Sequence, residues 1–225
     1  MRPVLEHRWD LSPKEAIELQ KQLADRVILR DECGPLRTVC GLDVSYDKTS
    51  DLFFAVAAVL SYPALTVVEI ARASSRSPFP YVPGLLSFRE IPVVREALSL
   101  LKTPPDLFVC DGQGYAHPRH FGLACHLGVL YDLPCIGAAK SRLFGEYKEP
   151  AQEKGSWTWL VGDERHIGQV VRTRAGVAPL FVSPGHRISF HAARKIALSL
   201  CPKWRLPETT RMAHHEVNQM RRENL

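Results

Sequence analysis

The sequence lacks the features that mark zinc-binding, secreted and membrane-spanning proteins. Its six cysteines include no C-x-x-C pair, which argues against a zinc site or a disulfide framework. The first ten residues, "MRPVLEHRWD", contain no apolar segment of the kind that a secretory signal requires. The longest unbroken apolar run, residues 52–60, is too short to cross a bilayer. We therefore expect a cytoplasmic protein whose cysteines are reduced core residues.

Length and charge narrow the class of protein further. A chain of 225 residues with 45% hydrophobic residues suits one domain, residues 1–225, with a full core. The formal net charge of +5 suits an anionic partner without establishing one. The sequence shows no internal repeat, low-complexity segment or domain linker, and no feature indicates a self-complementary interface. The expectation is a single compact domain that acts as a monomer.

The first clear element is a helix in "SPKEAIELQKQL". Ser12 is a good N-cap, Pro13 fits the first helical position, and Glu15 is placed to complete a capping box. The apolar face of this helix is formed by Ala16, Leu19, Leu23 and Val27. The pattern predicts a helix that packs on the domain ahead of the main sheet.

Three strand-like segments follow, at residues 37–46, 52–60 and 65–73. The connections "DKTSD" and "SYPA" are short enough for hairpins, which predicts an antiparallel meander. Residues 84–102 have helical composition, with Pro92 as an interruption or a new first turn. The later chain alternates between strand and helix patterns: strand at 106–111, helix at 121–132, strand at 134–140, a hairpin at 156–162 and 167–173, and helix at 190–200. The predicted fold class is α/β, with a mixed sheet and helices on both faces.

Two carboxylates lie where a carboxylate is costly or functionally placed. Asp43 lies in the middle of the strand "TVCGLDVSY" between apolar neighbours, where an ionised group needs a partner or a metal ion. Asp111 ends the apolar run "DLFVC" and precedes "GQG", at the strand end where open α/β sheets place ligands. Pairing with an arginine, or a hydrogen bond in a turn, explains each residue equally well when it is taken alone.

Glu90 lies in or near the helix at 84–102 and by itself is consistent with a solvated helix charge. Together, however, carboxylates from a first strand, a helix and a later strand resemble the metal cage of the ribonuclease-H-like nucleases. In that arrangement oxygen ligands hold Mg²⁺, which retains several of its waters. The order of elements in this chain therefore favours a metal-dependent site.

Longer motifs make the resemblance specific. The chain resembles the endonuclease V family, whose members repair deaminated bases, through motifs in the same order along almost its whole length: "GLDVSY", "PYVPGLLSFRE", "DGQGYAHPRHFG", "IGAAKSRLFG", "VSPGHR" and "RLPETTRMAH". The resemblance implies a ribonuclease-H-like fold and recognition of hypoxanthine (deoxyinosine) in DNA. It also implies hydrolysis of the second phosphodiester bond 3′ to the lesion, which leaves a 3′-hydroxyl and a 5′-phosphate.

The resemblance assigns the catalytic residues one by one. The metal-binding carboxylates of the family correspond to Asp43, Glu90 and Asp111, which implies Mg²⁺ as cofactor, with Mn²⁺ able to substitute. Lys140 matches the lysine of the "AKSRL" motif and offers a cation to the phosphate. His214 matches the histidine of the last motif, where it can coordinate through water or transfer a proton, and its neighbour His215 competes for this role on sequence alone.

The proline-rich stretch "PYVP" matches the family's strand-separating wedge. The wedge consists of Pro80, Tyr81, Val82 and Pro83, in which the prolines restrict the backbone so that the tyrosine ring can enter the DNA helix. The lesion-base pocket implied by the resemblance is lined by Gly84, Leu86, Gly112, Gly122 and Leu143. Small residues there allow backbone amides to reach the edge of the base. The exocyclic amine of adenine is itself a hydrogen-bond donor and would face these donor amides.

Other positions have weaker assignments. His117 and Arg119 lie on the loop after Asp111 and are candidates for a phosphate contact. Trp157 and Trp159 alternate on a strand, as core or sheet-surface residues do. Departures from the family are Thr209, where proline is usual, and Val82, where isoleucine is frequent.

Two other functions fit the same motifs. The first is an inosine-specific ribonuclease, because some relatives prefer RNA. The second is a non-catalytic lesion-binding module, against which the carboxylates argue, because a pure binder gains nothing from acidic groups that face phosphate. The expected partner is DNA that contains deaminated bases, and no membrane is involved.

Overall fold

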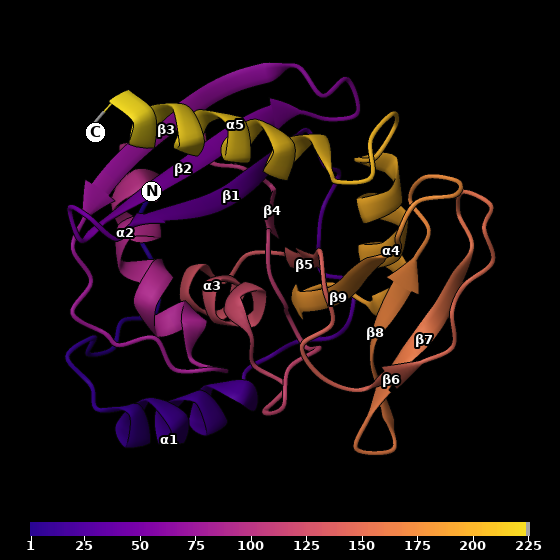
Figure 1. Ribbon diagram of the computed structural model, residues 1–225, viewed down its shortest axis with the longest axis horizontal. Coiled ribbons are helices and arrows are strands. Elements are labelled where there is room, and N and C mark those ends of the chain that lie inside the picture. The colour runs from indigo at the N-terminus through magenta and orange to yellow at the C-terminus, as the bar shows by residue number, and fades with distance from the viewer. Residues whose placement is uncertain (224–225) are drawn as a thin grey trace.

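The computed structural model describes residues 1–223 and has one mixed sheet between two layers of helices (Figure 1). The strands are β1 Thr38–Asp47, β2 Leu52–Ser61, β3 Val67–Ser75, β4 Leu107–Cys110, β5 Cys135–Ala139, β6 Glu146–Tyr147, β7 Trp157–Gly162, β8 Arg165–Val171 and β9 Leu180–His186. The helices are α1 Pro13–Ala24, α2 Leu86–Leu100, α3 Leu123–Tyr131, α4 Phe190–Ser199 and α5 Glu208–Glu223. The order across the sheet is β3-β2-β1-β4-β5-β9-β8-β7-β6.

The sheet has the predicted organisation. Strands β1, β2 and β3 form the antiparallel meander, and β1, β4 and β5 are adjacent and parallel. The third strand begins at Val67, later than predicted, because Leu65 has a positive φ of 58° in the preceding turn. The predicted fold class, a mixed α/β sheet with helices on both faces, is confirmed.

Helix α1 begins as its sequence predicts. The Ser12 side chain accepts a hydrogen bond from the Glu15 amide, and the Glu15 carboxylate accepts one from the Ser12 amide at 2.8 Å, which completes the capping box. Ala16 and Leu23 are buried, and the helix ends at Ala24, so Val27 lies beyond it. In Figure 1, α1 lies outside α3 and away from the sheet.

Pro92 does not interrupt helix α2. A proline inside a helix removes one backbone hydrogen bond, but the face formed by Ile91, Val94 and Leu98 is buried against the sheet and α3. Burial of these side chains offsets the lost bond, since each apolar side chain of this size stabilises by about 1.5–3 kcal/mol when it is removed from water. The helix is therefore continuous.

Strand β9 was not predicted, because the sequence "SPGH" suggests a turn. In the structure β9 is fully buried between β5 and β8. The register shifts between Cys135, which pairs with His186, and Ile136, which pairs with Pro184, so Gly185 is an extra residue that forms a bulge in β9. The Pro184 carbonyl accepts a hydrogen bond from the Tyr115 amide at 2.8 Å. A bulged ladder thus accommodates a proline that usually excludes a central strand.

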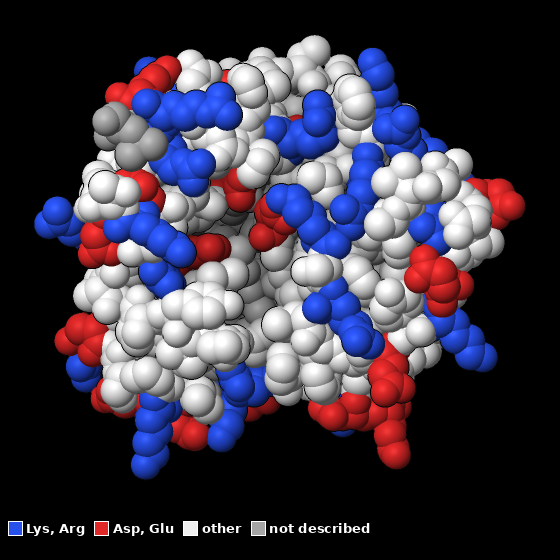
Figure 2. Space-filling model, in the orientation of Figure 1, with Lys and Arg blue, Asp and Glu red and all other residues white. Residues whose placement is uncertain are grey.

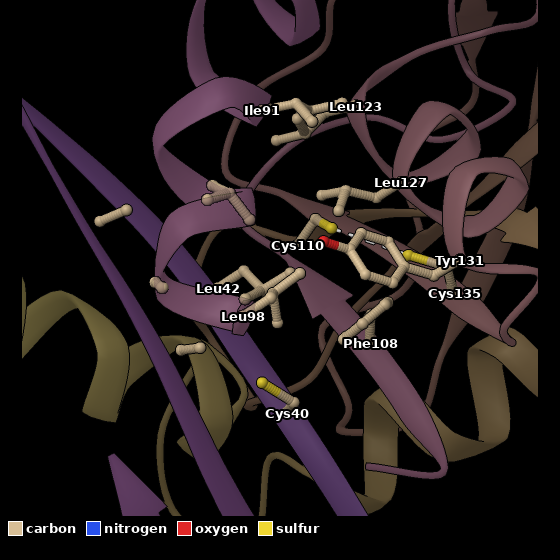
Figure 3. Packing of buried hydrophobic residues seen from close by; sticks show 14 of the residues in the cluster. Cys40, Leu42, Ile91, Leu98, Phe108, Cys110, Leu123, Leu127, Tyr131 and Cys135 are labelled. Carbon is tan, nitrogen blue, oxygen red and sulfur yellow. Dashed lines mark hydrogen bonds between the residues drawn. The ribbon is translucent and has the colours of Figure 1, made fainter. Parts of the chain in front are cut away.

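Two cores lie on opposite faces of the sheet. Figure 3 shows the first, in which Leu42 of β1 and Phe108 of β4 pack with Leu98 of α2 and Leu127 of α3. The second core contains the other faces of β1, β4 and β5 together with α4 and α5. Because both layers are anchored to the same strands, helices from both faces reach the ends of β1, β4 and β5.

Helix α5 packs unusually close to β1. A Cβ atom added at Gly41 would lie 2.1 Å from the Thr209 carbonyl oxygen, so only glycine permits this approach. Thr209 is fully buried, and α5 begins at Glu208 although the family's proline is absent. The glycine therefore brings the first turns of α5 onto the strand that carries Asp43.

All six cysteines are free thiols, and all but Cys33 are buried, as predicted for core residues. Within residues 1–223 no helix has the length and apolarity needed to cross a membrane.

Candidate active site

Side chains from three adjacent parallel strands meet at one edge of the sheet. Leu42 pairs with Cys110 in the β1–β4 ladder, so the next residues, Asp43 and Asp111, are neighbours. Lys140 directly follows β5, the next strand in the sheet. This is the carboxyl end of the parallel ladders, where open α/β sheets bind their ligands, although β1 itself continues beside β2 to Asp47.

Helices from both faces complete this group. Glu90 comes from α2 and His214 from α5, and both line one pocket of about 290 Å³ with Asp43, Asp111 and Lys140. We call this the catalytic pocket. The five residues that the sequence assigned to catalysis therefore surround a common space, although up to 171 positions separate them.

Like charges perturb the carboxyl groups of the catalytic pocket. Burial, followed by the charges of Asp43 and Asp111, raises the pKa of Glu90 to about 8. Burial also raises the pKa of Asp43, with a further contribution from Asp111, while the hydrogen bond from His214 opposes the increase. The pocket thus concentrates more negative charge than its own cations balance.

His214 is held in one orientation. Its Nδ1 lies 2.7 Å from Asp43 Oδ2, and the Asn218 side-chain amide donates to its Nε2 at 3.1 Å. Since Nε2 accepts, the proton lies on Nδ1, and His214 donates to the Asp43 carboxylate. His215 lines a separate groove along α5 and is absent from the residues of the catalytic pocket, so position distinguishes the two histidines.

Lys140 forms an ion pair with Asp111, and its backbone is also fixed. The Arg205 guanidinium donates to the Lys140 carbonyl at 2.7 Å and to the Pro179 carbonyl at 2.9 Å. The Lys140 side chain is 40% exposed, whereas that of Asp111 is 17% exposed. The ammonium group is therefore available to a ligand that enters the pocket.

A second cavity, of about 340 Å³, adjoins the catalytic pocket and shares Asp111, Leu123 and Lys140 with it. We call it the base pocket. All of the positions predicted to bind the lesion base line it, namely Gly84, Leu86, Gly112, Gly122 and Leu143. Tyr81, Val82 and Pro83 of the predicted wedge form another part of its wall.

The wedge segment is anchored at its sides and exposed at its tip. Phe79 is buried beside Phe88, and Val82 packs against the same small core. Tyr81 is 67% exposed, and the Arg89 guanidinium lies 5.9 Å from its ring centroid. Pro80 and Pro83 flank the exposed ring, so the segment presents an aromatic side chain on a restricted backbone.

His117 and Arg119 bind the protein itself. The Gly84 carbonyl, in a left-handed turn with φ of 80°, accepts hydrogen bonds from His117 Nε2 at 3.0 Å, Arg119 Nη2 at 2.8 Å and Gln20 Nε2 at 3.1 Å. Burial lowers the pKa of His117 to about 4, so the ring is neutral at physiological pH. Both side chains hold the turn between the wedge and the base pocket. Their contact with phosphate stays a prediction.

Other residues of the site had no sequence signal. Gln113 lines the base pocket, and its amide donates to the Ser141 carbonyl at 2.9 Å. Its buried Oε1 has no hydrogen-bond partner among the described residues. Gln20 and Asn218 were missed because they lie on amphipathic helices, where a polar residue resembles a surface position.

The donor set of the catalytic pocket fits a hard divalent cation. Asp43, Glu90 and Asp111 offer carboxylate oxygens, the ligands that Mg²⁺ prefers, and the mutual charge of these groups favours a cation between them. Among residues 1–223, no group of three or more His, Cys, Asp or Glu side chains is already arranged to hold a metal ion. The fit therefore rests on the chemistry and charge of the donors, and it agrees with an ion that keeps several waters.

Figure 2 shows acidic side chains in the hollow at the centre of one face, with Lys and Arg side chains around it. A mixed sheet with carboxylates at the carboxyl end of its central parallel ladders has the organisation of the ribonuclease-H-like class.

Comparisons with known proteins identify the family within this class. The family model of endonuclease V matches residues 21–215. Endonuclease V of Nostoc punctiforme is 48% identical over 209 residues, which cover 92% of this chain and 95% of that protein. The chain belongs to the endonuclease V family, whose members are DNA repair nucleases.

Solved structures agree in fold. Endonuclease V from Streptomyces avermitilis superposes with a TM-score of 0.92 at 46% identity and covers 96% of both chains. Endonuclease V from Ciona intestinalis, solved in complex with a 24mer DNA containing an inosine followed by a ribo-adenosine, has a TM-score of 0.83 at 30% identity. That alignment covers 94% of this chain and 98% of the Ciona chain.

Proposed function

We propose that this protein recognises deoxyinosine in DNA and hydrolyses the second phosphodiester bond 3′ to the lesion, leaving a 3′-hydroxyl and a 5′-phosphate. The observation that carries the proposal is the junction of the base pocket with the catalytic pocket through Asp111 and Lys140. When a flipped base occupies the base pocket, the backbone of the same DNA strand passes through the catalytic pocket. The relative from Ciona intestinalis, crystallised with inosine-containing DNA, supports this substrate.

Asp43, Glu90 and Asp111 are the residues that would hold Mg²⁺, with Mn²⁺ able to substitute. When bound there, the ion would supply an activated water and neutralise charge on the phosphate oxygens. His214 orients Asp43 through its Nδ1 hydrogen bond, so that the carboxylate keeps one geometry. Lys140 contributes a positive charge beside the phosphate, where it acts most strongly as negative charge develops.

The base pocket selects the lesion through hydrogen-bond polarity. Hypoxanthine differs from adenine by an oxygen acceptor at C6 and a proton on N1. Backbone amides around Gly84 and Gly112 match that oxygen, whereas the Gly122 amide donates to the Gly114 carbonyl at 3.0 Å. The unpartnered Oε1 of Gln113 matches an N–H group. The exocyclic amine of adenine would instead face a backbone amide, so two hydrogen-bond donors would oppose each other. Both groups would be buried without a partner, which lowers the affinity for adenine.

Tyr81 fills the gap that the flipped base leaves in the stack. Its exposed ring lies at the rim of the base pocket, and the bonds from His117, Arg119 and Gln20 to Gly84 fix the turn that follows it. The ring enters the duplex with little loss of conformational freedom, because Pro80 and Pro83 already restrict its backbone.

The experiment that tests the proposal is cleavage of matched inosine and adenine oligonucleotides, as DNA and as RNA, with Mg²⁺. Selective cutting of inosine DNA is expected, at the second bond 3′ to the lesion. Asp43→Ala and Asp111→Asn should reduce cleavage at least about 100-fold while lesion binding persists. Undiminished cleavage by both variants would refute the assignment of the metal ligands.

The RNA substrate tests the second candidate, an inosine-specific ribonuclease. The ribo-adenosine that follows inosine in the Ciona complex shows that a relative accommodates a ribonucleotide there. Faster cutting of RNA than of DNA would favour that function. Inosine binding without cleavage of either substrate would instead favour a non-catalytic lesion-binding module.

We also propose that residues 1–225 act as one domain and as a monomer in the cytoplasm. Both cores share the same strands, which supports a single cooperative unit. The six free thiols suit a reducing compartment.

A further inference from the structure

Three hollows follow one another across the face that carries the site. The base pocket and the catalytic pocket share Asp111, Leu123 and Lys140. The catalytic pocket and an open groove along α5, of about 860 Å³, share His214 and Asn218. A strand that passes from the base pocket through the catalytic pocket therefore continues directly into the groove along α5.

The groove leads to an exposed tryptophan. Trp204 lies in the loop between α4 and α5, and its side chain is 37% exposed. The Arg211 guanidinium lies 4.6 Å from the ring centroid, and the Lys203 ammonium lies 5.1 Å from it. Arg211 also lines the groove, where it pairs with Glu208 at 3.3 Å. An exposed indole with two cations nearby offers a base a stacking surface and a phosphate a positive field.

The loop that carries Trp204 is tied to the catalytic pocket. The next residue, Arg205, donates from its side chain to the Lys140 carbonyl at 2.7 Å. The Arg205 carbonyl accepts from the Thr173 hydroxyl at 2.6 Å, and the Glu208 amide donates to the Leu200 carbonyl at 2.8 Å. The indole thus has a fixed position relative to Lys140.

We propose that the groove along α5 and Trp204 bind the DNA nucleotides on the 3′ side of the cleaved bond, with the indole stacked on one of their bases. This orientation rests on the proposed function, in which the lesion precedes the cleaved bond. With the lesion in the base pocket and the cleaved phosphate in the catalytic pocket, the 3′ continuation passes His214 and reaches Arg211 and Trp204. Arg222 adds a cation farther along the groove, Glu208 and Glu223 also line it, and Lys203 and Arg211 lie beside Trp204.

The test compares two single-stranded inosine oligonucleotides. One ends at the nucleotide that follows the cleaved bond, and the other extends further by about eight nucleotides, the length of a typical single-strand site. Dissociation constants are measured with EDTA, so that no strand is cut. Trp204→Ala should weaken binding of the long oligonucleotide about 10-fold, because the stacked base loses its platform. On the short oligonucleotide the same variant should differ from wild type by less than about twofold.

Two further variants control for folding and for general aromatic surface. Trp204→Phe keeps a ring and should bind the long oligonucleotide within about twofold of wild type. Trp157, on β7, is also 37% exposed and has the Arg194 guanidinium 3.9 Å from its ring centroid, but it lines neither pocket nor the groove. Trp157→Ala should therefore leave both affinities unchanged.

Equal losses on both oligonucleotides for Trp204→Ala, or no loss on the long one, would overturn the proposal. Failure of the proposed function has a different signature, in which the wild type binds the long inosine and adenine oligonucleotides equally. A length-dependent loss for Trp204→Ala on both sequences would then still support a strand-binding groove.

Discussion

Glu90 should destabilise the metal-free protein at alkaline pH. The pKa of its carboxyl group rises from an ordinary 4.5 to about 8 in the folded state. Between these pH values the unfolded chain releases the proton and the folded chain retains it, so stability falls as pH rises. Below pH 4.5 both states are protonated and the loss is absent. Above pH 8 the full loss applies, and it should be relieved in Glu90→Gln, which has nearly the same shape without the charge.

The expected gain follows from the pKa change. One pKa unit corresponds to about 1.4 kcal/mol, so Glu90→Gln should raise the free energy of unfolding by about 2–5 kcal/mol at pH 9 in EDTA. The lower part of this range allows for the partial exposure of the side chain. Near pH 4.5 variant and wild type should agree. Urea unfolding at both pH values provides the measurement.

Glu96→Gln is the matched control, because Glu96 lies on the exposed face of the same helix. It should change stability little at either pH. Mg²⁺ should stabilise the wild type more than Glu90→Gln, since the variant lacks one ligand and one of the repelling charges. A pH-independent difference between Glu90→Gln and wild type would refute the argument that charge concentrates in the catalytic pocket.

Three further changes test the other parts of the site. Lys140→Ala should lower the single-turnover cleavage rate about 100-fold while changing affinity less, because the Lys140 charge acts on the negative charge that develops during cleavage. A rate equal to that of the wild type would make Lys140 a binding residue only. Tyr81→Ala should weaken binding to duplex inosine DNA by about 1–3 kcal/mol and to the single strand less, in paired equilibrium titrations, whereas equal losses would exclude the wedge role. His117, with a pKa of about 4 against an ordinary 6.5, should give stability that is complete above pH 6.5 and falls by up to about 3 kcal/mol as pH drops through 4. Acid titration of His117→Gln should lack this component.

Local chemistry made the early fold predictable. The capping box at Ser12 and Glu15 and the hairpins of β1, β2 and β3 depend on residues close together in sequence. Strand β9 escaped prediction because Pro184 normally disrupts a ladder, and the strand that β9 pairs with, β5, lies almost fifty positions earlier.

The site was predictable only in part. Asp43 and Asp111 were conspicuous because each follows or interrupts an apolar strand, whereas Glu90 looked like a surface charge until it was considered together with the two aspartates. The contacts of His117 and Arg119 with Gly84 depend on the path of the loop between β4 and α3. The bond from Arg205 to Lys140 links residues 65 positions apart, and no local pattern encodes it.

Assembly of the site from both helix layers links its chemistry to the packing of the whole sheet. The carboxyl end of the parallel ladders provides Asp43, Asp111 and Lys140, while α2 brings Glu90 from one face and α5 brings His214 from the other. The close contact of α5 with Gly41 fixes His214 against Asp43. The same helix begins just after the Trp204 loop and forms the wall of the groove. The position of α5 therefore couples the orientation of Asp43, a proposed metal ligand, to the surface proposed to bind the strand beyond the cleaved bond.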